Sequence, residues 1–434
     1  MQRPARSLLT VLGVTFGLAV TVGNVIGAGI MRTPGDIAAE LPTFWPFLSV
    51  WIIGALYATL GANALAELSA MTPQSGGQYV FVRRALGDYA GFVVGWSDWI
   101  STCGTTALVT MTLGEYAVQL APALPPAKVL ALVVVAVLTL VQWFGVRAGA
   151  ATQDFTSALK ALVLILLIIA CLVAGGRNPF GGGVELERET SLFVAFVLAL
   201  QAVIYTYDGW TAPIYFAGEV KNPGRDLPRS MFGGLALVTA IYLLINIAFV
   251  RVVPLATIAG QKLAAATVAR FLFGTNGYMI VLSIMVIGLI SAANSNVMIA
   301  PRVIWAMAND RLFWRAGAEV NAGGTPDISL LISSVIAVVF IITGTFNTVL
   351  AKLAFFFVAN YALSFASLFV LRVRESNAER PFRAIGHPYT TAIALLASIT
   401  FLVGAVIGDW GNTIWALGIL FASLPIYLLI RMHR

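Results

Sequence analysis

The chain has 434 residues, of which 59% are hydrophobic and only 10% are charged, and its mean hydropathy is +0.90. A soluble domain does not tolerate so apolar a composition, which excludes a soluble enzyme or binding module and indicates an integral membrane protein. The net charge of +7 does not indicate a nucleic-acid partner, because most Lys and Arg residues lie between apolar runs and report membrane topology.

Apolar runs long enough to cross the lipid bilayer predict twelve spans in a single all-α membrane domain. They lie near residues 9–39, 44–68, 88–120, 127–145, 155–175, 191–218, 229–253, 275–307, 326–344, 348–372, 388–408 and 411–431. The first run lacks the pattern of a cleaved signal peptide, and further spans follow at once, so we expect it to remain as a span.

An even number of spans places both termini on the same side of the membrane. Most of the 26 Lys and Arg residues fall on that side. Three of the connections there, 72–88, 218–230 and 371–388, combine charge with Gly or Pro. The positive-inside rule therefore predicts a multi-pass protein of the plasma (inner) membrane with cytoplasmic termini.

The first predicted span contains VTVGNVIGAGIMRTPG, residues 20–35, which is poorly suited to a continuous helix. Gly23, Gly27 and Gly29 lower helix propensity and let a ligand approach the backbone. Inside a bilayer, a break is tolerated only where protein encloses it or where it lines a cavity, so a break marks a site. Taken alone, the Gly23-x-x-x-Gly27 spacing favours close helix packing through small residues.

The sixth predicted span, QAVIYTYDGWTAPIYFAGEV at residues 201–220, places Asp208 at mid-membrane with Pro213 just beyond it. An acid in hydrocarbon costs at least about 2.5 kcal/mol on insertion scales and is functional by default. A packing role for a hydrogen-bonded Asp208 is the alternative interpretation. Spans 1 and 6 open two five-span halves, and matched interruptions in the two halves predict an inverted-repeat secondary transporter.

Unwinding span 1 at about residues 24–29 would expose the amides of residues 27–29, just before a half-helix that begins near Ile30. Unpaired donors and the helix dipole favour an anion there. Free carbonyls around Val25 in span 1 and Tyr205 in span 6 would favour a cation. A site with donors on one side and acceptors on the other suits a zwitterion, so the sequence predicts an α-amino acid as substrate.

Five segments in order resemble the amino acid-polyamine-organocation superfamily, most closely its L-type amino-acid transporter branch. They are GNVIGAGIMRTPG (23–35), PQSGGQYVFVRRALG (73–87), GVRAGAATQDFTSALKALVL (145–164), YTYDGWTAPIYFAGEVKNPGRDLPRS (205–230) and ERPFRAIGHP (379–388). The resemblance covers all twelve spans. It implies a LeuT-type fold in which helices 1–5 (9–175) and 6–10 (191–372) are inverted repeats and helices 11–12 (388–431) are peripheral.

The resemblance also implies residue roles. Gly27, Ala28 and Gly29 match the family's glycine-rich loop for the substrate carboxylate, and Tyr205 matches the aromatic gate over the bound substrate. Asp208 and Trp210 fall where the family tunes side-chain selectivity. The middle loop residue is often serine in the family, so with Ala28 one hydroxyl donor is missing and the carboxylate must rely on backbone amides.

Lys160 matches a lysine in span 5 that, in sodium-independent members of the family, stands where related symporters bind sodium between spans 1 and 8. A buried ammonium there should bond the freed carbonyls near Gly23 and Asn24 and polar groups of span 8 such as Ser291 or Ser295. Snorkelling of Lys160 to the cytoplasmic interface is the alternative. Exchange, proton symport and facilitated diffusion all stay open.

Two further features bear on partners and coupling. No cysteine lies in the outer connection 120–128, where animal L-type members are disulfide-linked to a glycoprotein, so no heavy subunit is expected. Asp98 in span 3 matches no motif; it is either a second intramembrane acid for proton coupling or an interfacial or packing residue.

Other functional classes fit the sequence less well. An enzyme in the membrane would gather acid–base groups or metal ligands within its spans, whereas His387 and His433 lie at cytoplasmic edges and Cys103 and Cys171 lie in apolar segments. We therefore expect no enzyme activity, cofactor or metal. A channel would favour a symmetric ring of charge or carbonyls. Among transporters, the rival substrate is a polyamine or another organic cation, with Asp208 as its counter-charge.

Overall fold

The computed structural model describes residues 8–27, 29–174, 191–344, 346–408 and 410–432. The described chain is helical, and its extended pairing is a single parallel bridge between Leu12 and Val220. The helices are α1 (Val14–Val25), α2 (Gly29–Glu40), α3 (Phe44–Met71), α4 (Gln78–Leu86), α5 (Asp88–Leu120), α6 (Ala127–Trp143), α7 (Val146–Ala174), α8 (Leu192–Tyr207), η1 (Ala212–Glu219), α9 (Pro223–Val252), α10 (Leu255–Ile258), α11 (Ala264–Phe273), α12 (Asn276–Asn309), η2 (Arg315–Ala318), α13 (Asp327–Thr343), α14 (Phe346–Arg374), α15 (Tyr389–Gly408) and α16 (Trp410–Met432).

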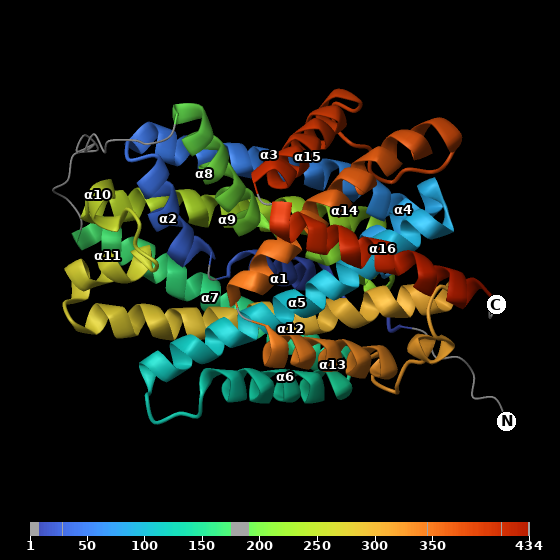
Figure 1. The fold of residues 1–434 in the computed structure, drawn as a ribbon, viewed down its shortest axis with the longest axis horizontal. Helices are drawn as coiled ribbons and strands as arrows, with labels where there is room; N and C mark the ends of the chain where they lie inside the picture. The colour runs from blue at the N-terminus through green and yellow to red at the C-terminus, as the bar shows by residue number, and fades with distance from the viewer. Residues whose placement is uncertain (1–7, 28, 175–190, 345, 409, 433–434) are drawn as a thin grey trace.

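Most of the long helices run along the long axis of the molecule (Figure 1). At the centre, α12 packs against α5, α7 and α1, while α3 packs against α9 and α8. The blue start of the chain and the red end of α16 both lie at the right of Figure 1, and α10 and α11 lie at the left. We call these two ends of the molecule the terminus side and the far side.

Length and composition alone qualify six of the described helices as membrane spans, or seven when the bent pair of α1 and α2 counts as one. Five shorter apolar helices of 10–17 residues accompany them. The chain is therefore an all-helical, multi-pass membrane protein. Most helix boundaries lie within a few residues of the predicted spans, and α5 occupies Asp88–Leu120 as predicted.

The clearest difference from the predicted spans concerns α7, which begins at Val146 rather than near residue 155. Its first turns contain polar residues, so apolarity alone does not reveal them as helix. Two of these residues, Gln153 and Ser157, are buried against α1 and α12 rather than exposed. As a result, Lys160 lies midway along α7 and not near its start.

Both predicted interruptions are present as breaks in the helices. The axes of α1 and α2 differ by 45° across the break between Val25 and Gly29. The second break separates α8, which ends at Tyr207, from the 3-10 helix η1, which begins at Ala212. Gly209 sits in this break with φ +104°, a conformation that a side chain would make unfavourable.

Candidate functional site

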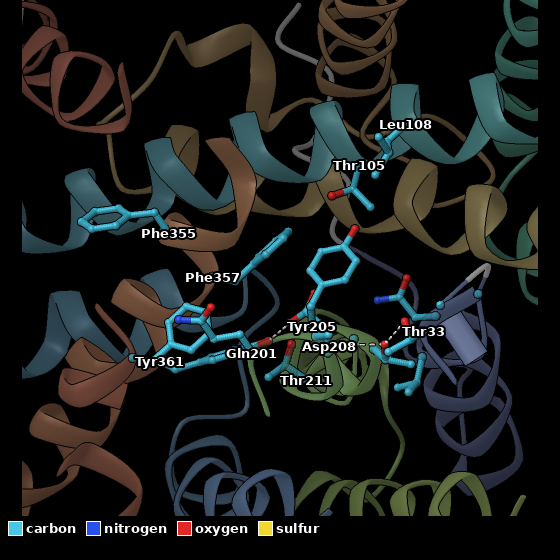
Figure 2. Close-up of a pocket in the computed structure, with 18 of the residues that line it drawn as sticks. Thr33, Thr105, Leu108, Gln201, Tyr205, Asp208, Thr211, Phe355, Phe357 and Tyr361 are labelled. Carbon is cyan, nitrogen blue, oxygen red and sulfur yellow. Dashed lines mark hydrogen bonds between the residues drawn. The ribbon is translucent and has the colours of Figure 1, made fainter. Parts of the chain in front are cut away.

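A cavity of about 810 Å³ lies against both helix breaks (Figure 2). Its walls come from α1, α2, α4, α5, α8, η1, α12, α14 and α15. The polar part of the lining includes Asn24, Thr33, Gln78, Asp98, Thr102 and Asp208. The apolar part includes Val194, Val197, Leu198, Phe355, Phe357 and Phe401. The cavity therefore combines a polar floor at the breaks with an apolar wall.

The two breaks touch each other. A Cβ added to Gly209 would lie 2.9 Å from the side-chain nitrogen of Asn24, so only glycine permits this approach. The hydroxyl of Tyr242, in α9, lies 2.8 Å from the carbonyl oxygen of Val25 and 3.1 Å from that of Thr206, and can donate to either. The hydroxyl of a single tyrosine is thus within hydrogen-bond distance of a carbonyl oxygen at each of the two breaks. Sequence reasoning missed it, because a tyrosine within an apolar run is only a weak signal.

The first turn of α2 presents backbone donors at the cavity. The helix begins at Gly29, and the amides of a first helical turn have no acceptor within the helix. Gly27 and Gly29 line the cavity, whereas Ile30 is fully buried and does not. Ala28 lies outside the described residues.

The structure differs from the sequence expectation for three backbone groups at the breaks. The amide of Gly27 does not stand free but donates to the carbonyl of Val25 at 2.8 Å. That carbonyl also accepts the bond from Tyr242, and the carbonyl of Tyr205 accepts from the amide of Asp208 at 3.1 Å. Local turns pair these groups as soon as the helix ends, which a sequence pattern does not show.

The three span 6 side chains singled out from the sequence have different positions. Tyr205 lines the cavity and points toward Thr105 of α5 in Figure 2. Asp208 also lines it, and its carboxylate accepts a hydrogen bond from the hydroxyl of Tyr361 in α14. Trp210 does not line this cavity. It is 2% exposed and packs 5.1 Å from the ring of Tyr361, behind the acid.

Lys160 is buried behind the first break, with 2% of its surface exposed. Its ammonium donates to the carbonyl of Gly23 at 2.9 Å and to that of Ile26, both left free at the end of α1. These bonds exclude snorkelling to the interface in this structure. Gly288 of α12 lies beside the lysine, where an added Cβ would be in ordinary contact with the lysine Cε at 3.4 Å.

The expected contact of Lys160 with α12 serines is absent among the described residues. Ser291 instead lies 2.9 Å from Ser157 and accepts from Gln153 at 3.2 Å. The hydroxyl of Ser295 is buried without a partner there. Ser291 can bond to α7 because Gly23 lets α7 and α12 approach α1 closely: a Cβ on Gly23 would lie 1.9 Å from the Gln153 amide nitrogen. Gly23 is thus a packing glycine.

The cavity is closed toward the terminus side by a buried ion pair. Arg302 of α12 pairs with Glu219 of η1 at 2.5 Å, and the side chains are 3% and 0% exposed. The guanidinium also lies 4.3 Å from the ring centroid of Phe216. The amide of Leu12 donates to the carbonyl of Glu219 at 2.9 Å, which fixes the chain before α1 to the same place. We call Leu12, Phe216, Glu219 and Arg302 the inner closure. Sequence reasoning missed it, because both charges fall at the ends of spans, where exposure is the ordinary expectation.

Toward the far side, the cavity is bordered by outer parts of the same helices. Arg32 and Asp36 of α2, Leu108 of α5 and Phe193 of α8 all belong to its lining. These residues lie beyond the breaks as seen from the inner closure. The structure therefore has a cavity that reaches toward the far side and is sealed on the terminus side.

A multi-pass helical protein whose polar cavity lies at two broken helices has the organisation of a secondary transporter. The chain belongs to the amino acid permease family, whose model matches residues 7–427. This confirms the family predicted from the sequence, and it makes the protein a transporter rather than an enzyme.

Curated relatives cover nearly the whole chain. It is 27% identical over 425 residues to the serine/threonine exchanger SteT of Bacillus subtilis (strain 168), covering 96% of this chain and 95% of the relative. It is 28% identical over 412 residues to the b(0,+)-type amino acid transporter 1 of Homo sapiens, covering 92% and 83%. It is 26% identical over 437 residues to the human large neutral amino acids transporter small subunit 2, covering 96% and 80%.

Proposed function

We propose that this protein moves L-amino acids across the plasma membrane by alternating access. The observation that carries the proposal is the contact between the two helix breaks at one cavity: Gly209 approaches Asn24, and Tyr242 reaches carbonyls of both breaks. The family match and the printed names of the relatives, which include an exchanger and two amino acid transporters, support the same substrate class.

The substrate carboxylate binds at the first turn of α2, where Gly29 lines the cavity with Ile30 directly behind it and the helix dipole favours an anion. Gly27 lines the space directly before this turn, and a Cβ on it would meet nothing within 4 Å. The amino group lies toward the breaks' carbonyls, near Val25 and Tyr205. The Tyr205 carbonyl keeps a second lone pair for a ligand, and the Val25 carbonyl has one when the Tyr242 hydroxyl donates to Thr206 instead. Val25, Gly27, Ala28, Gly29, Ile30, Tyr205, Asp208 and Trp210 are the proposed substrate-site residues, with Ile30 and Trp210 acting from behind the lining.

The proposed architecture has twelve spans with cytoplasmic termini, in which helices 1–5 and 6–10 form inverted repeats and the last two helices are peripheral. The terminus side, which holds the inner closure, is then cytoplasmic, and the cavity is open to the outside. Transport is sodium-independent, by exchange or by proton coupling, with the Lys160 ammonium, bound to the carbonyls of Gly23 and Ile26, in place of a sodium ion. The chain works without a disulfide-linked heavy subunit, in keeping with the burial of Cys103 and Cys171.

Transport of a polyamine or another organic cation is the second candidate. One observation favours it: three carboxylates, Asp36, Asp98 and Asp208, belong to the lining of the cavity. The donor-rich start of α2 at Gly29 favours the amino acid, because a polyamine has no carboxylate to occupy those amides.

A thermal-shift screen of the purified protein against the common L-amino acids and several polyamines tests the proposal, since a ligand of the folded state stabilises it by mass action. Ligands found in this way are then tested for saturable uptake and counterflow in proteoliposomes. Stabilisation by amino acids with counterflow supports the proposal. Stabilisation by polyamines alone identifies the second candidate, and conduction without counterflow contradicts both.

A further inference from the structure

Asp98 of α5 is a buried acid that neither the family motifs nor the proposed substrate contacts use. It is 2% exposed and belongs to the lining of the cavity. The Tyr215 hydroxyl lies 2.9 Å from each of its carboxylate oxygens. Within the described residues, Tyr215 is the side chain that donates to it, and none of the ion pairs includes it. A carboxylate offers about four acceptor sites and a hydroxyl has one proton, so most of its capacity is unused.

The charge around Asp98 favours a cationic ligand. A buried carboxylate is costly unless it is paired and hydrogen-bonded. The Lys160 ammonium is engaged at the carbonyls of Gly23 and Ile26. Arg32, toward the far side of the cavity, interacts with Asp36 and Tyr116. Asp208 adds a second negative charge that acts on Asp98. The negative charges of Asp98 and Asp208 in this part of the cavity therefore favour binding of a cation.

Tyr215 connects Asp98 with the inner closure. It lies in η1, directly before Phe216 and four residues before Glu219, which hold Arg302. Its ring packs on Gly77, where a Cβ would come within 2.2 Å, and its carbonyl accepts from the amide of Gly76 at 3.3 Å. The hydroxyl that holds Asp98 is thus part of the segment that seals the terminus side.

From these contacts we infer that Asp98 binds a cationic group on the substrate side chain, an ammonium or a guanidinium, and that this contact releases Tyr215 and loosens the inner closure. The inference rests on the proposed amino acid transport and names a substrate class for it. A ligand shifts a conformational equilibrium only through its different affinity for the two states. Here the cation binds the Asp98 carboxylate more strongly once Tyr215 has left it. A bound cationic substrate therefore favours opening of the inner closure.

The predicted binding of a cationic side chain by Asp98 is tested with arginine, lysine and leucine on the purified full-length protein. Asp98→Asn should lower the affinity for arginine and lysine at least tenfold while changing that for leucine less than threefold. Asp154→Asn, in the half-buried part of α7 away from the cavity, is the matched control and should change neither. Equal losses for all three ligands, or no loss, would overturn the inference. A wild-type protein that exchanges leucine but does not bind arginine would also overturn it while leaving the proposed function intact.

The predicted coupling between Asp98 and the inner closure is tested with a reporter residue that contacts the closure. Ser75 is 2% exposed and lies 3.4 Å from a Glu219 carboxylate oxygen, so Ser75→Cys, in a background without Cys103 and Cys171, should react with a maleimide only when the closure opens. Arginine should speed this labelling several-fold, and Asp98→Asn should abolish the acceleration. Tyr215→Phe should raise labelling without ligand and also raise the arginine affinity, because the Asp98 carboxylate is then free of the tyrosine hydroxyl. Labelling that arginine does not change, or a Tyr215→Phe variant that loses arginine binding, would overturn the coupling.

Discussion

Gly27 and Gly23 lie four residues apart in one glycine-rich motif but have different surroundings. A Cβ on Gly23 would collide with Gln153, Ser157 and Ser291, whereas a Cβ on Gly27 would meet nothing within 4 Å and would enter the cavity. The packing interpretation of the motif therefore describes Gly23. The ligand-approach interpretation remains a proposal for Gly27, and the two can be separated by mutation.

We expect Gly27→Ala to fold with wild-type thermal stability and to raise KM several-fold, and Gly27→Val to abolish uptake, because the added carbons occupy the space in front of the α2 amides. Gly13→Ala is the matched control, since Gly13 also has no neighbour within 4 Å of an added Cβ but lies away from the cavity. Gly29→Val should also lose uptake, but for another reason: its Cβ would collide with Thr206, at 2.9 Å. Near-normal uptake by a stable Gly27→Val variant would contradict the carboxylate site.

Asp208 gives a prediction about side-chain selectivity. Its carboxylate faces the cavity and is held by Tyr361. Replacing a hydrogen-bonded charge costs about 1–3 kcal/mol, or roughly 5- to 150-fold in affinity. We therefore expect Asp208→Asn to weaken binding of arginine by this amount and of leucine much less, as measured by calorimetry. Equal losses would instead assign the carboxylate to the helix break or to the shared amino group.

At the scale of the helices, Lys160 joins α7 to the end of α1. The proposed ammonium role predicts that uptake is unchanged when choline replaces sodium, because a sodium ion beside this charge would be repelled in a low-dielectric site. Lys160→Ala leaves the carbonyls of Gly23 and Ile26 unpaired and should lower kcat more than it changes KM, since the lysine does not line the cavity. Lys262→Ala, in an exposed loop, is the control.

The same variant tests for proton coupling. If Lys160 carries the coupled proton, wild-type uptake rises as the external pH falls and Lys160→Ala loses this dependence; a structural charge gives parallel pH profiles. Sodium-stimulated uptake by the wild type would refute the role of the ammonium in place of sodium. A fully active Lys160→Ala variant would show that the bonds to α1 are dispensable.

The elements also show how far the sequence could predict the fold. Apolarity located most of the long helices, and glycine, proline and a mid-membrane acid located both breaks, because these residues act on the local backbone. The start of α7 was missed because its polar residues are buried against other helices. The contacts of Tyr242, the burial of Trp210 behind Tyr361 and the pairing of Glu219 with Arg302 were missed as well. Each depends on residues distant in sequence, for which one chain offers no signal.

On the scale of the whole molecule, the cavity and the inner closure describe one end of an alternating-access cycle. The cavity reaches the far side past Arg32 and Phe193, and Arg302 with Glu219 seals the terminus side. Partly exposed ion pairs on the terminus side, such as Arg84 with Glu375, are worth at most about 1 kcal/mol. Breaking a buried pair costs about 3–5 kcal/mol, because the remaining charge is left uncompensated. The buried pair of Arg302 and Glu219 is therefore a stronger determinant of which side is open than the partly exposed pairs are.

This difference predicts the conformational effect of Glu219→Gln. In the sealed state, Arg302 would keep a buried charge without its partner, whereas opening of the terminus side would let water reach the guanidinium. The equilibrium should therefore shift toward the state that is open on the terminus side. With Thr105→Cys in the cavity as reporter, labelling by an impermeant maleimide from the far side should fall, while labelling of Ser75→Cys from the terminus side should rise. Glu375→Gln, which breaks a partly exposed pair, should leave both rates near wild type. Unchanged labelling of both reporters in a folded Glu219→Gln variant would show that contacts other than this ion pair keep the terminus side closed.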